Sequence, residues 1–250
     1  MILLERAKSS SQIASEAIGQ ALLHARNTCS KGSAQMTGAG DPTRRKDAIW
    51  KNGNGLRKAM ESGKVRGCVV LFGEPNARQT FFERTLTLME ASLAERFIVL
   101  IGGDLGAGAD LLVAELRRRR ADQLSSFSSD LEENGLSPFY PFGSFEAPGV
   151  VSLTKDLAGE RAVHKVPVII GFPEFYRTST WATAVSFLSL GFTVQIGTRL
   201  PFWGSPSLTE VLLKDWPEMT GGKLLASPAL PDDKTQAEEM VSYLKARRVN

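Results

Sequence analysis

Residues 65–73 read Val-Arg-Gly-Cys-Val-Val-Leu-Phe-Gly, an apolar run that ends in a glycine. A stretch with helical character follows over residues 77–94, and residues 97–103, Phe-Ile-Val-Leu-Ile-Gly-Gly, repeat the apolar run and its terminal glycine. Short runs that are apolar on both faces are typical of parallel strands covered by helices on both sides. The fold is therefore expected to be built from alternating strands and helices.

The same alternation continues to the end of the chain. The expected strands cover residues 65–72, 97–101, 138–142, 166–170, 192–196 and 224–226. The expected helices cover residues 77–94, 107–120, 147–157, 179–190, 207–214 and 233–248. The polar, Ser-rich residues 122–135 are interpreted as a loop. Alternation over six units predicts an α/β protein with a doubly wound, mostly parallel, Rossmann-like sheet.

The beginning of the chain has a different composition. Leu and Ile within residues 1–25 are spaced as in an amphipathic helix, and residues 27–47 are rich in Gly, Ser, Thr and other polar groups. We expect an N-terminal amphipathic helix and polar linker over residues 1–47, followed by a single α/β domain over residues 48–250.

Charge and hydropathy exclude several classes of partner. The formal net charge of +3 is too small to argue for binding to nucleic acid or to a membrane surface. The basic run Arg117–Arg120 is interpreted as the polar end of a helix. No apolar run approaches the roughly 18 residues that cross a bilayer, and no secretory signal is recognised. The expectation is a cytoplasmic protein without membrane insertion.

Cysteine and histidine are scarce. The two cysteines and two histidines exclude a disulfide framework and an iron–sulfur cluster held by four thiolates of this chain. Cys68 lies in an apolar run and is expected in the core, and Cys29 is expected as an exposed thiol of the linker. His164 is interpreted as a polar residue just before a strand. No metal and no cofactor are expected.

Polar residues follow the expected strands, at the edge where open parallel sheets bind ligands. The candidate lining residues of a small-molecule site are Glu74, Asn76, Asp104, Ser144, Glu146, Glu174 and Arg199. The alternative interpretation is that these residues are helix caps, first-turn acids and surface charges. The glycines of residues 102–108 do not fit the dinucleotide spacing G-x-G-x-x-G, although a bare phosphate site at that helix start stays open.

Three stretches resemble the C-terminal domain of nickel-containing carbon monoxide dehydrogenases and, more distantly, hybrid-cluster proteins. They are Ser62-Gly-Lys-Val-Arg-Gly67 with the run to Gly73 and Asn76, then Pro167 through Pro173-Glu174 and Trp181-Ala182 to Gly191, and Pro201 through Gly204-Ser205-Pro206 and Thr209-Glu210 to Thr220-Gly221-Gly222. The resemblance covers the chain from about residue 48 to the end.

In that family this domain supplies cysteines to a nickel–iron–sulfur cluster and a lysine near the substrate. The resemblance places the three cysteines on Glu74, Gly103 and Phe145 and the lysine on Ser179. None of the four positions keeps the family's residue. Glu74 could bind a hard metal, but Gly103 and Phe145 have no side chain that could bind one. The resemblance therefore implies a cluster-free protein, and carbon monoxide oxidation is not expected.

Two functions follow as hypotheses. The first is a non-catalytic interaction, structural or regulatory subunit that pairs with itself or with another protein subunit, possibly of a metalloenzyme. The second is a small-molecule or phosphate site, enzymatic or sensory, at the carboxyl edge of the sheet. A third hypothesis, a cluster ligated wholly by another chain at a shared boundary, is not favoured.

Overall fold

A computed structural model describes residues 49, 52–74, 82–142, 147–174, 177–198, 200, 204–226 and 232–246. The chain divides into two compact units, Met1–Pro42 and Thr43–Asn250, and every described residue belongs to the second. The expected N-terminal helix and linker lie outside the described residues, so the expected boundary at residue 48 stays a prediction.

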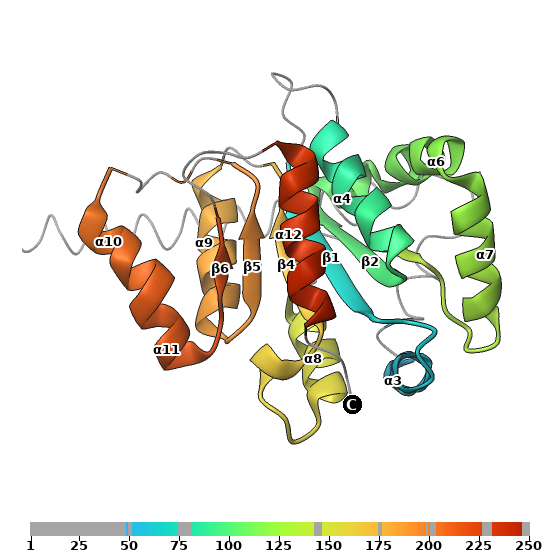
Figure 1. Ribbon diagram of the computed structural model, residues 1–250, viewed down its shortest axis with the longest axis horizontal. Coiled ribbons are helices and arrows are strands. Elements are labelled where there is room, and N and C mark those ends of the chain that lie inside the picture. The colour runs from blue at the N-terminus through green and yellow to red at the C-terminus, as the bar shows by residue number, and fades with distance from the viewer. Residues whose placement is uncertain are drawn as a thin grey trace, which may run out of the picture. The chain divides into compact units, whose positions relative to one another are not determined.

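The second unit is built on a six-stranded sheet in the order β3-β2-β1-β4-β5-β6 (Figure 1). All neighbouring strands in this order run parallel. The strands are β1 (Gly67–Gly73), β2 (Phe97–Gly103), β3 (Phe139–Pro141), β4 (Val168–Phe172), β5 (Thr193–Ile196) and β6 (Leu224–Leu225). The first strand, β1, lies in the middle of the sheet. The chain then builds one half outward to β3 and the other outward to β6, which confirms the predicted doubly wound α/β class.

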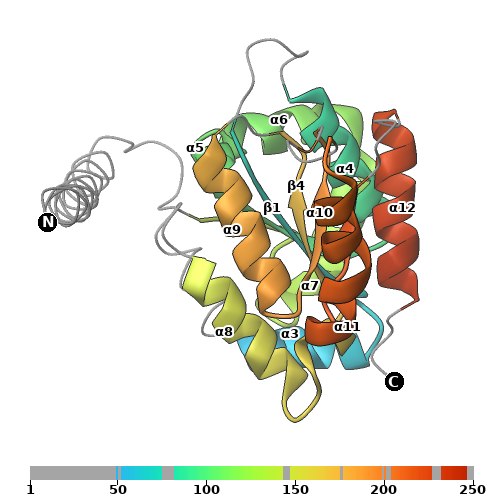
Figure 2. The same cartoon turned by 90° about the vertical axis from the view of Figure 1, so that its left-hand side faces the viewer.

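Helices cover both faces of this sheet. The longer ones are α3 (Gly53–Glu61), α4 (Glu83–Ala94), α6 (Ala109–Arg119), α7 (Ala121–Glu132), α8 (Ala147–Ala158), α9 (Thr178–Ser189) and α12 (Asp233–Lys245). Helices α4 and α12 pack side by side on one face, and α9 lies on the opposite face (Figure 2). Shorter elements are α5 (Asp104–Ala107), the 3₁₀ turn Val163–Lys165, α10 (Pro206–Glu210), the π-helical turn Val211–Asp215 and α11 (Trp216–Thr220).

The strands are buried on both faces, as their apolar sequences predict. Every residue of β1 is buried, and Ile98, Val99 and Leu100 of β2 are fully inaccessible to solvent. Cys68 is 1% exposed and lies in the core as expected. Burial raises the pKa of its thiol to about 12, so Cys68 is a protonated core residue.

The interpretation of residues 122–135 as a loop is wrong. Residues 121–132 form helix α7, whose buried side chains are Leu124, Phe127 and Leu131. Their spacing of three and four residues is that of one helix face, while Ser125, Ser126 and Ser129 between them are exposed. The high serine content led to the prediction of a loop, but the segment is an amphipathic helix that packs near the β3 edge of the sheet.

Several element boundaries also differ from those expected. Strand β2 extends through Gly103 because Gly102 and Gly103 pair in register with the last residues of β1. Strand β4 begins and ends two residues later than expected. The expected helix over residues 207–214 is part of a longer helical segment over 206–220, interrupted by the π-helical turn. Helix α3 was not anticipated.

Among the helices of the described residues, none is long and apolar enough to cross a membrane.

Candidate functional site

Two buried carboxylates stand where the carboxyl ends of β1 and β4 lie side by side. Glu74 directly follows β1, and Glu174 lies two residues beyond the end of β4. Glu74 is 4% exposed and Glu174 is 1% exposed. The backbone N–H of Glu74 donates a hydrogen bond to the backbone carbonyl oxygen of Glu174 over 3.0 Å. This is the topological switch point, where open parallel sheets bind ligands. Two of the expected lining residues are therefore neighbours at that point.

The carboxylate of Glu74 is engaged by the start of helix α9. Its Oε2 accepts a hydrogen bond from the backbone N–H of Arg177, the residue that precedes α9, over 3.2 Å. Its Oε1 accepts from the hydroxyl of Thr180 in the first turn. A carboxylate at this end of a helix satisfies N–H groups that lack helical partners and suits the helix dipole. Glu74 thus ties the end of β1 to the beginning of α9.

Arg177 extends this contact to a second carboxylate. Its Nε lies 3.8 Å from Oε1 of Glu74, and its Nη1 donates to Oδ2 of Asp104 over 3.0 Å. The side chains of Arg177 and Asp104 are 52% and 41% exposed, so this outer pair is in contact with solvent. The charges that the sequence places on separate loops are therefore joined into one ion-pair chain, with Glu74 at its buried end.

The loops at this edge pack so closely that strand-terminal glycines are required. A Cβ atom on Gly73 would stand 2.3 Å from the carbonyl oxygen of Glu174, and one on Gly197 would stand 2.4 Å from that of Pro173. Both distances are shorter than real Cβ contacts. The glycines allow the backbones of adjacent loops to approach each other directly over the ends of β1, β4 and β5.

Gly103 has a backbone conformation that other residues rarely adopt. Its φ is 67° and its ψ is −149°, a region that is essentially restricted to glycine. A Cβ there would also lie 3.3 Å from the carbonyl oxygen of Gly73. The position that the resemblance assigns to a cysteine is therefore unsuited, in its present conformation, to any side chain.

Aromatic rings fill the space beneath the edge. The ring of Phe72 packs edge-on against Phe142 at 5.2 Å, stacks with Phe172 at 5.6 Å and lies 5.4 Å from Phe187. Phe72 and Phe172 come from the ends of β1 and β4, so the apolar cluster underlies the two buried carboxylates. Among the residues that the structure describes, the floor of the switch point is apolar.

The structure describes half of the ten positions singled out in the sequence. Glu74, Gly103, Asp104 and Glu174 gather at the carboxyl edge, while Ser179 is an exposed residue in the first turn of α9. The others lie outside the described residues: Asn76, Ser144, Phe145, Glu146 and Arg199. Sequence reasoning missed Thr180, because only the fold brings it to Glu74, 106 residues earlier.

The described residues at this edge do not fit a nickel–iron–sulfur cluster. Such a cluster requires thiolates, and the one described cysteine, Cys68, is protonated within β1. Glu74 is the sole metal-binding side chain among the described ligand positions, and its carboxylate is already bonded to Arg177 and Thr180. Throughout the described ranges, no three His, Cys, Asp or Glu residues are grouped so that they could hold a metal ion.

Comparison with proteins of known sequence gives low but consistent similarity. The carbon monoxide dehydrogenase of Methanopyrus kandleri is 24% identical over 182 residues, which cover 68% of this chain and 28% of that protein. The carbon monoxide dehydrogenase of Methanocaldococcus jannaschii is 26% identical over 181 residues, which cover 69% of this chain and 28% of that protein. Carbon monoxide dehydrogenase 2 of Carboxydothermus hydrogenoformans is 24% identical over 200 residues, which cover 75% of this chain and 31% of that protein. The chain resembles carbon monoxide dehydrogenases.

The expected resemblance is thereby confirmed, although the chain spans less than a third of the length of these relatives. No family model matches it.

Solved structures show the same fold. An acetyl-CoA synthase/carbon monoxide dehydrogenase structure matches with a TM-score of 0.68 and 23% identity, over 82% of this chain and 32% of that one. Carbon monoxide dehydrogenase IV of Carboxydothermus hydrogenoformans matches with a TM-score of 0.63 and 19% identity, over 81% of this chain and 34% of that one. This chain therefore has the fold of one part of a carbon monoxide dehydrogenase.

Proposed function

We propose that this chain is a non-catalytic, carbon monoxide dehydrogenase-like interaction subunit, which pairs with itself or with another protein. The observation that carries the proposal is the backbone of Gly103. At a position that the resemblance assigns to a cluster ligand, the conformation is one that essentially only glycine adopts. The retained fold with altered ligand positions favours a role in assembly over the chemistry of the relatives.

The use of Glu74 supports the same conclusion. A carboxylate held by a backbone N–H and a hydroxyl is less available to coordinate a metal or to transfer protons. In this proposal Glu74 has a structural role, which is to connect β1 with α9.

Exposed apolar side chains beside the β6 end of the sheet supply a surface for assembly. Leu208 and Met219, on α10 and α11, are 44% and 73% exposed. Leu190, at the end of α9, is 53% exposed, and its neighbour Gly191 lies against the carbonyl oxygen of Thr220. Apolar side chains exposed on these neighbouring elements are candidates for a protein–protein contact. The known structures that share this fold include a multisubunit enzyme, acetyl-CoA synthase/carbon monoxide dehydrogenase.

The first test is metal analysis and an absorption spectrum of anaerobically purified protein. We expect a colourless protein without stoichiometric iron or nickel. Stoichiometric metal with a broad visible absorption band would contradict the proposal and would indicate that the protein is a metalloenzyme.

The second test is native mass spectrometry of the protein purified from its host. We expect an oligomer or a complex with another subunit, lost in the double variant Leu208→Glu/Met219→Glu. The matched control is Leu111→Glu, which changes a 65% exposed leucine on α6 and should leave the assembly intact. A monomer that retrieves no other protein would contradict the proposal.

The second candidate function is a small-molecule or phosphate site at the carboxyl edge, favoured by the position of Glu74 and Glu174 at the switch point. Thermal shifts with nucleotides, phosphates and divalent ions test it. Any shift should be reduced in Asp104→Asn, because Asp104 is the partly exposed carboxylate of the ion-pair chain. If none of these compounds changes the melting temperature, this candidate is wrong.

A further inference from the structure

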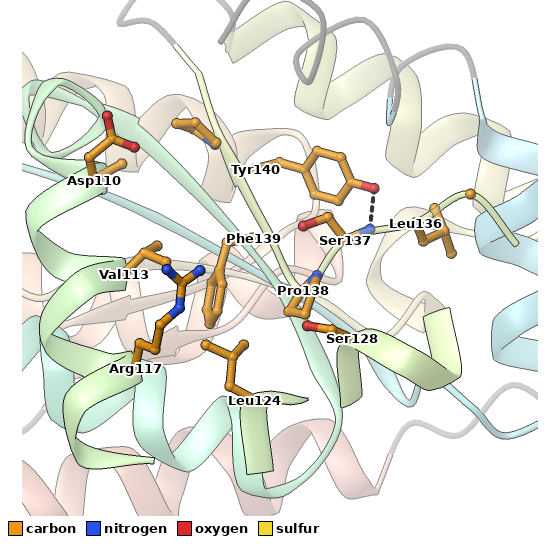
Figure 3. A pocket seen from close by; sticks show the side chains of 13 residues that line it. Asp110, Val113, Arg117, Leu124, Ser128, Leu136, Ser137, Pro138, Phe139 and Tyr140 are labelled. Atoms are coloured by element: carbon orange, nitrogen blue, oxygen red, sulfur yellow. Dashed lines mark hydrogen bonds between the residues drawn. The ribbon is translucent and has the colours of Figure 1, made fainter. Parts of the chain in front are cut away.

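A pocket of about 420 Å³ lies on the outer side of β3, at the opposite end of the sheet from β6 (Figure 3). Helix α6 and helix α7 contribute its walls, and residues 135–141 contribute the rest. Its volume lies within the range of about 300–1,000 Å³ that is usual for small-molecule sites. All of its lining residues are described, and none belongs to the carboxyl-edge site.

One wall of this pocket is apolar. Leu124 and Phe139 are 6% and 7% exposed, and Val113 of α6 and the rings of Pro138 and Pro141 also line the pocket. These side chains come from three different elements and leave a space between them. An apolar wall of this kind suits a ring or a branched aliphatic group.

One cation is available to a ligand in this pocket. The side chain of Arg117 reaches from α6 toward the ring of Phe139 (Figure 3). Its three successors in the chain, Arg118, Arg119 and Arg120, each pair with a glutamate. Arg117, by contrast, makes no ion pair with any carboxylate of the described ranges. A guanidinium beside an apolar wall suits a carboxylate, which it can bind with two parallel hydrogen bonds.

The opposite end of the pocket carries an acid. Asp110 lies seven residues before Arg117 on α6, which is about 10 Å along a helix. A ligand with a carboxylate at both ends would therefore be repelled at one of them. The charge arrangement favours a monoanion.

An extended peptide is a poorer fit than a small molecule. The prolines at 138 and 141 have no N–H to offer a paired strand, and the N–H of Ser137 already donates to the hydroxyl of Tyr140 over 2.7 Å (Figure 3). Few main-chain donors are left for pairing along this side of β3.

We propose that the pocket beside β3 binds a small monocarboxylate with a ring-containing apolar body. Its carboxylate pairs with Arg117 and its ring packs against Phe139 and Leu124. This site does not depend on how the carboxyl edge of the sheet is used.

Isothermal titration calorimetry with 3-phenylpropanoate tests the proposal, with 3-phenylpropanamide as the uncharged isostere. We expect the carboxylate to bind, and its affinity to fall by about tenfold or more in Arg117→Gln and for the amide, the scale of a lost charge-assisted hydrogen bond. Arg118→Gln is the matched control, because it removes a neighbouring cation that does not line the pocket, and it should bind as the wild type does. Ser128→Phe should also abolish binding, since its ring would fill the space.

Absence of binding to the wild-type protein would overturn the proposal. Equal affinity in Arg117→Gln, or equal affinity for the acid and the amide, would overturn it as well. Circular dichroism of each variant establishes that it is folded, and the two arginine variants change exposed side chains only.

Discussion

At the scale of single residues, the backbone of Gly103 is the most restrictive feature of the carboxyl edge. Replacement by alanine should lower the free energy of unfolding by about 1–3 kcal/mol, because the conformation at φ 67° and ψ −149° disfavours any Cβ. Gly204→Ala is the matched control, since a Cβ there would contact nothing within 4 Å, and it should change stability by less than about 0.5 kcal/mol. Urea denaturation measures both. An equal change in the free energy of unfolding for the two substitutions would mean that the backbone of Gly103 does not disfavour a side chain.

Glu74 is the second residue whose replacement separates the hypotheses. Glu74→Ala should cost about 2–4 kcal/mol of stability, because the N–H of Arg177 and the hydroxyl of Thr180 lose a buried, charged acceptor. Asp104→Asn removes the exposed partner of the same arginine and should cost less than about 1 kcal/mol. A neutral effect of Glu74→Ala would argue against a structural role and in favour of a functional carboxylate.

At the scale of elements, helix α7 shows where sequence reasoning failed. Phe127, 2% exposed, is the centre of its buried face, and the guanidinium of Arg96 lies 5.3 Å from its ring. Phe127→Ala should lower the free energy of unfolding by about 3–5 kcal/mol through the cavity it leaves. The neighbouring Ser126→Ala, on the exposed face, should stay within about 0.5 kcal/mol of the wild type. A small loss in the phenylalanine variant would mean that residues 121–132 are the loop that their composition suggests.

Another element-scale feature is the ion-pair network that joins α4 to α6. Arg119 contacts Glu83 at 2.6 Å, Glu90 at 3.4 Å and Glu115 at 2.7 Å. Hydrogen bonds from Arg118 and then Arg119 lower the pKa of Glu115 to about 2 from an ordinary 4.5. A hydrogen bond from Arg119 also lowers the pKa of Glu83. The basic run that the sequence indicated as a helix end is therefore paired, except at Arg117, with glutamates of the described helices.

At the scale of the whole molecule, this network contributes to the dependence of stability on pH. Carboxyl groups with a lowered folded-state pKa stabilise the fold above their unfolded pKa, and the contribution is lost as the pH falls. For Glu115 the loss spans the range from about 4.5 down to about 2. Between about pH 5 and about pH 3, Arg119→Gln should lose less stability than the wild type, as measured by urea denaturation. Lys234→Gln, outside the network, should keep the wild-type slope, and an Arg119→Gln slope equal to that of the wild type would contradict the prediction.

The sheet was predictable because buried parallel strands leave uninterrupted apolar runs, which are readable from local sequence. The carboxyl edge was predictable in outline for the same reason, since each strand end places its following residues there. The contact of Thr180 with Glu74 was not predictable, because it depends on the strand order that brings β1 beside β4. The conformation of Gly103 was not predictable either, since a glycine is compatible with many backbone angles.

The geometry at Gly103 also limits how this lineage could change. A single Gly103→Cys substitution would restore a thiol to the assigned position, but the backbone there disfavours the side chain that carries it. A cysteine at this position would be tolerated only together with a change in the loop that relaxes the backbone. Under the proposed function, a loss of cluster binding would therefore be difficult to reverse by single substitutions.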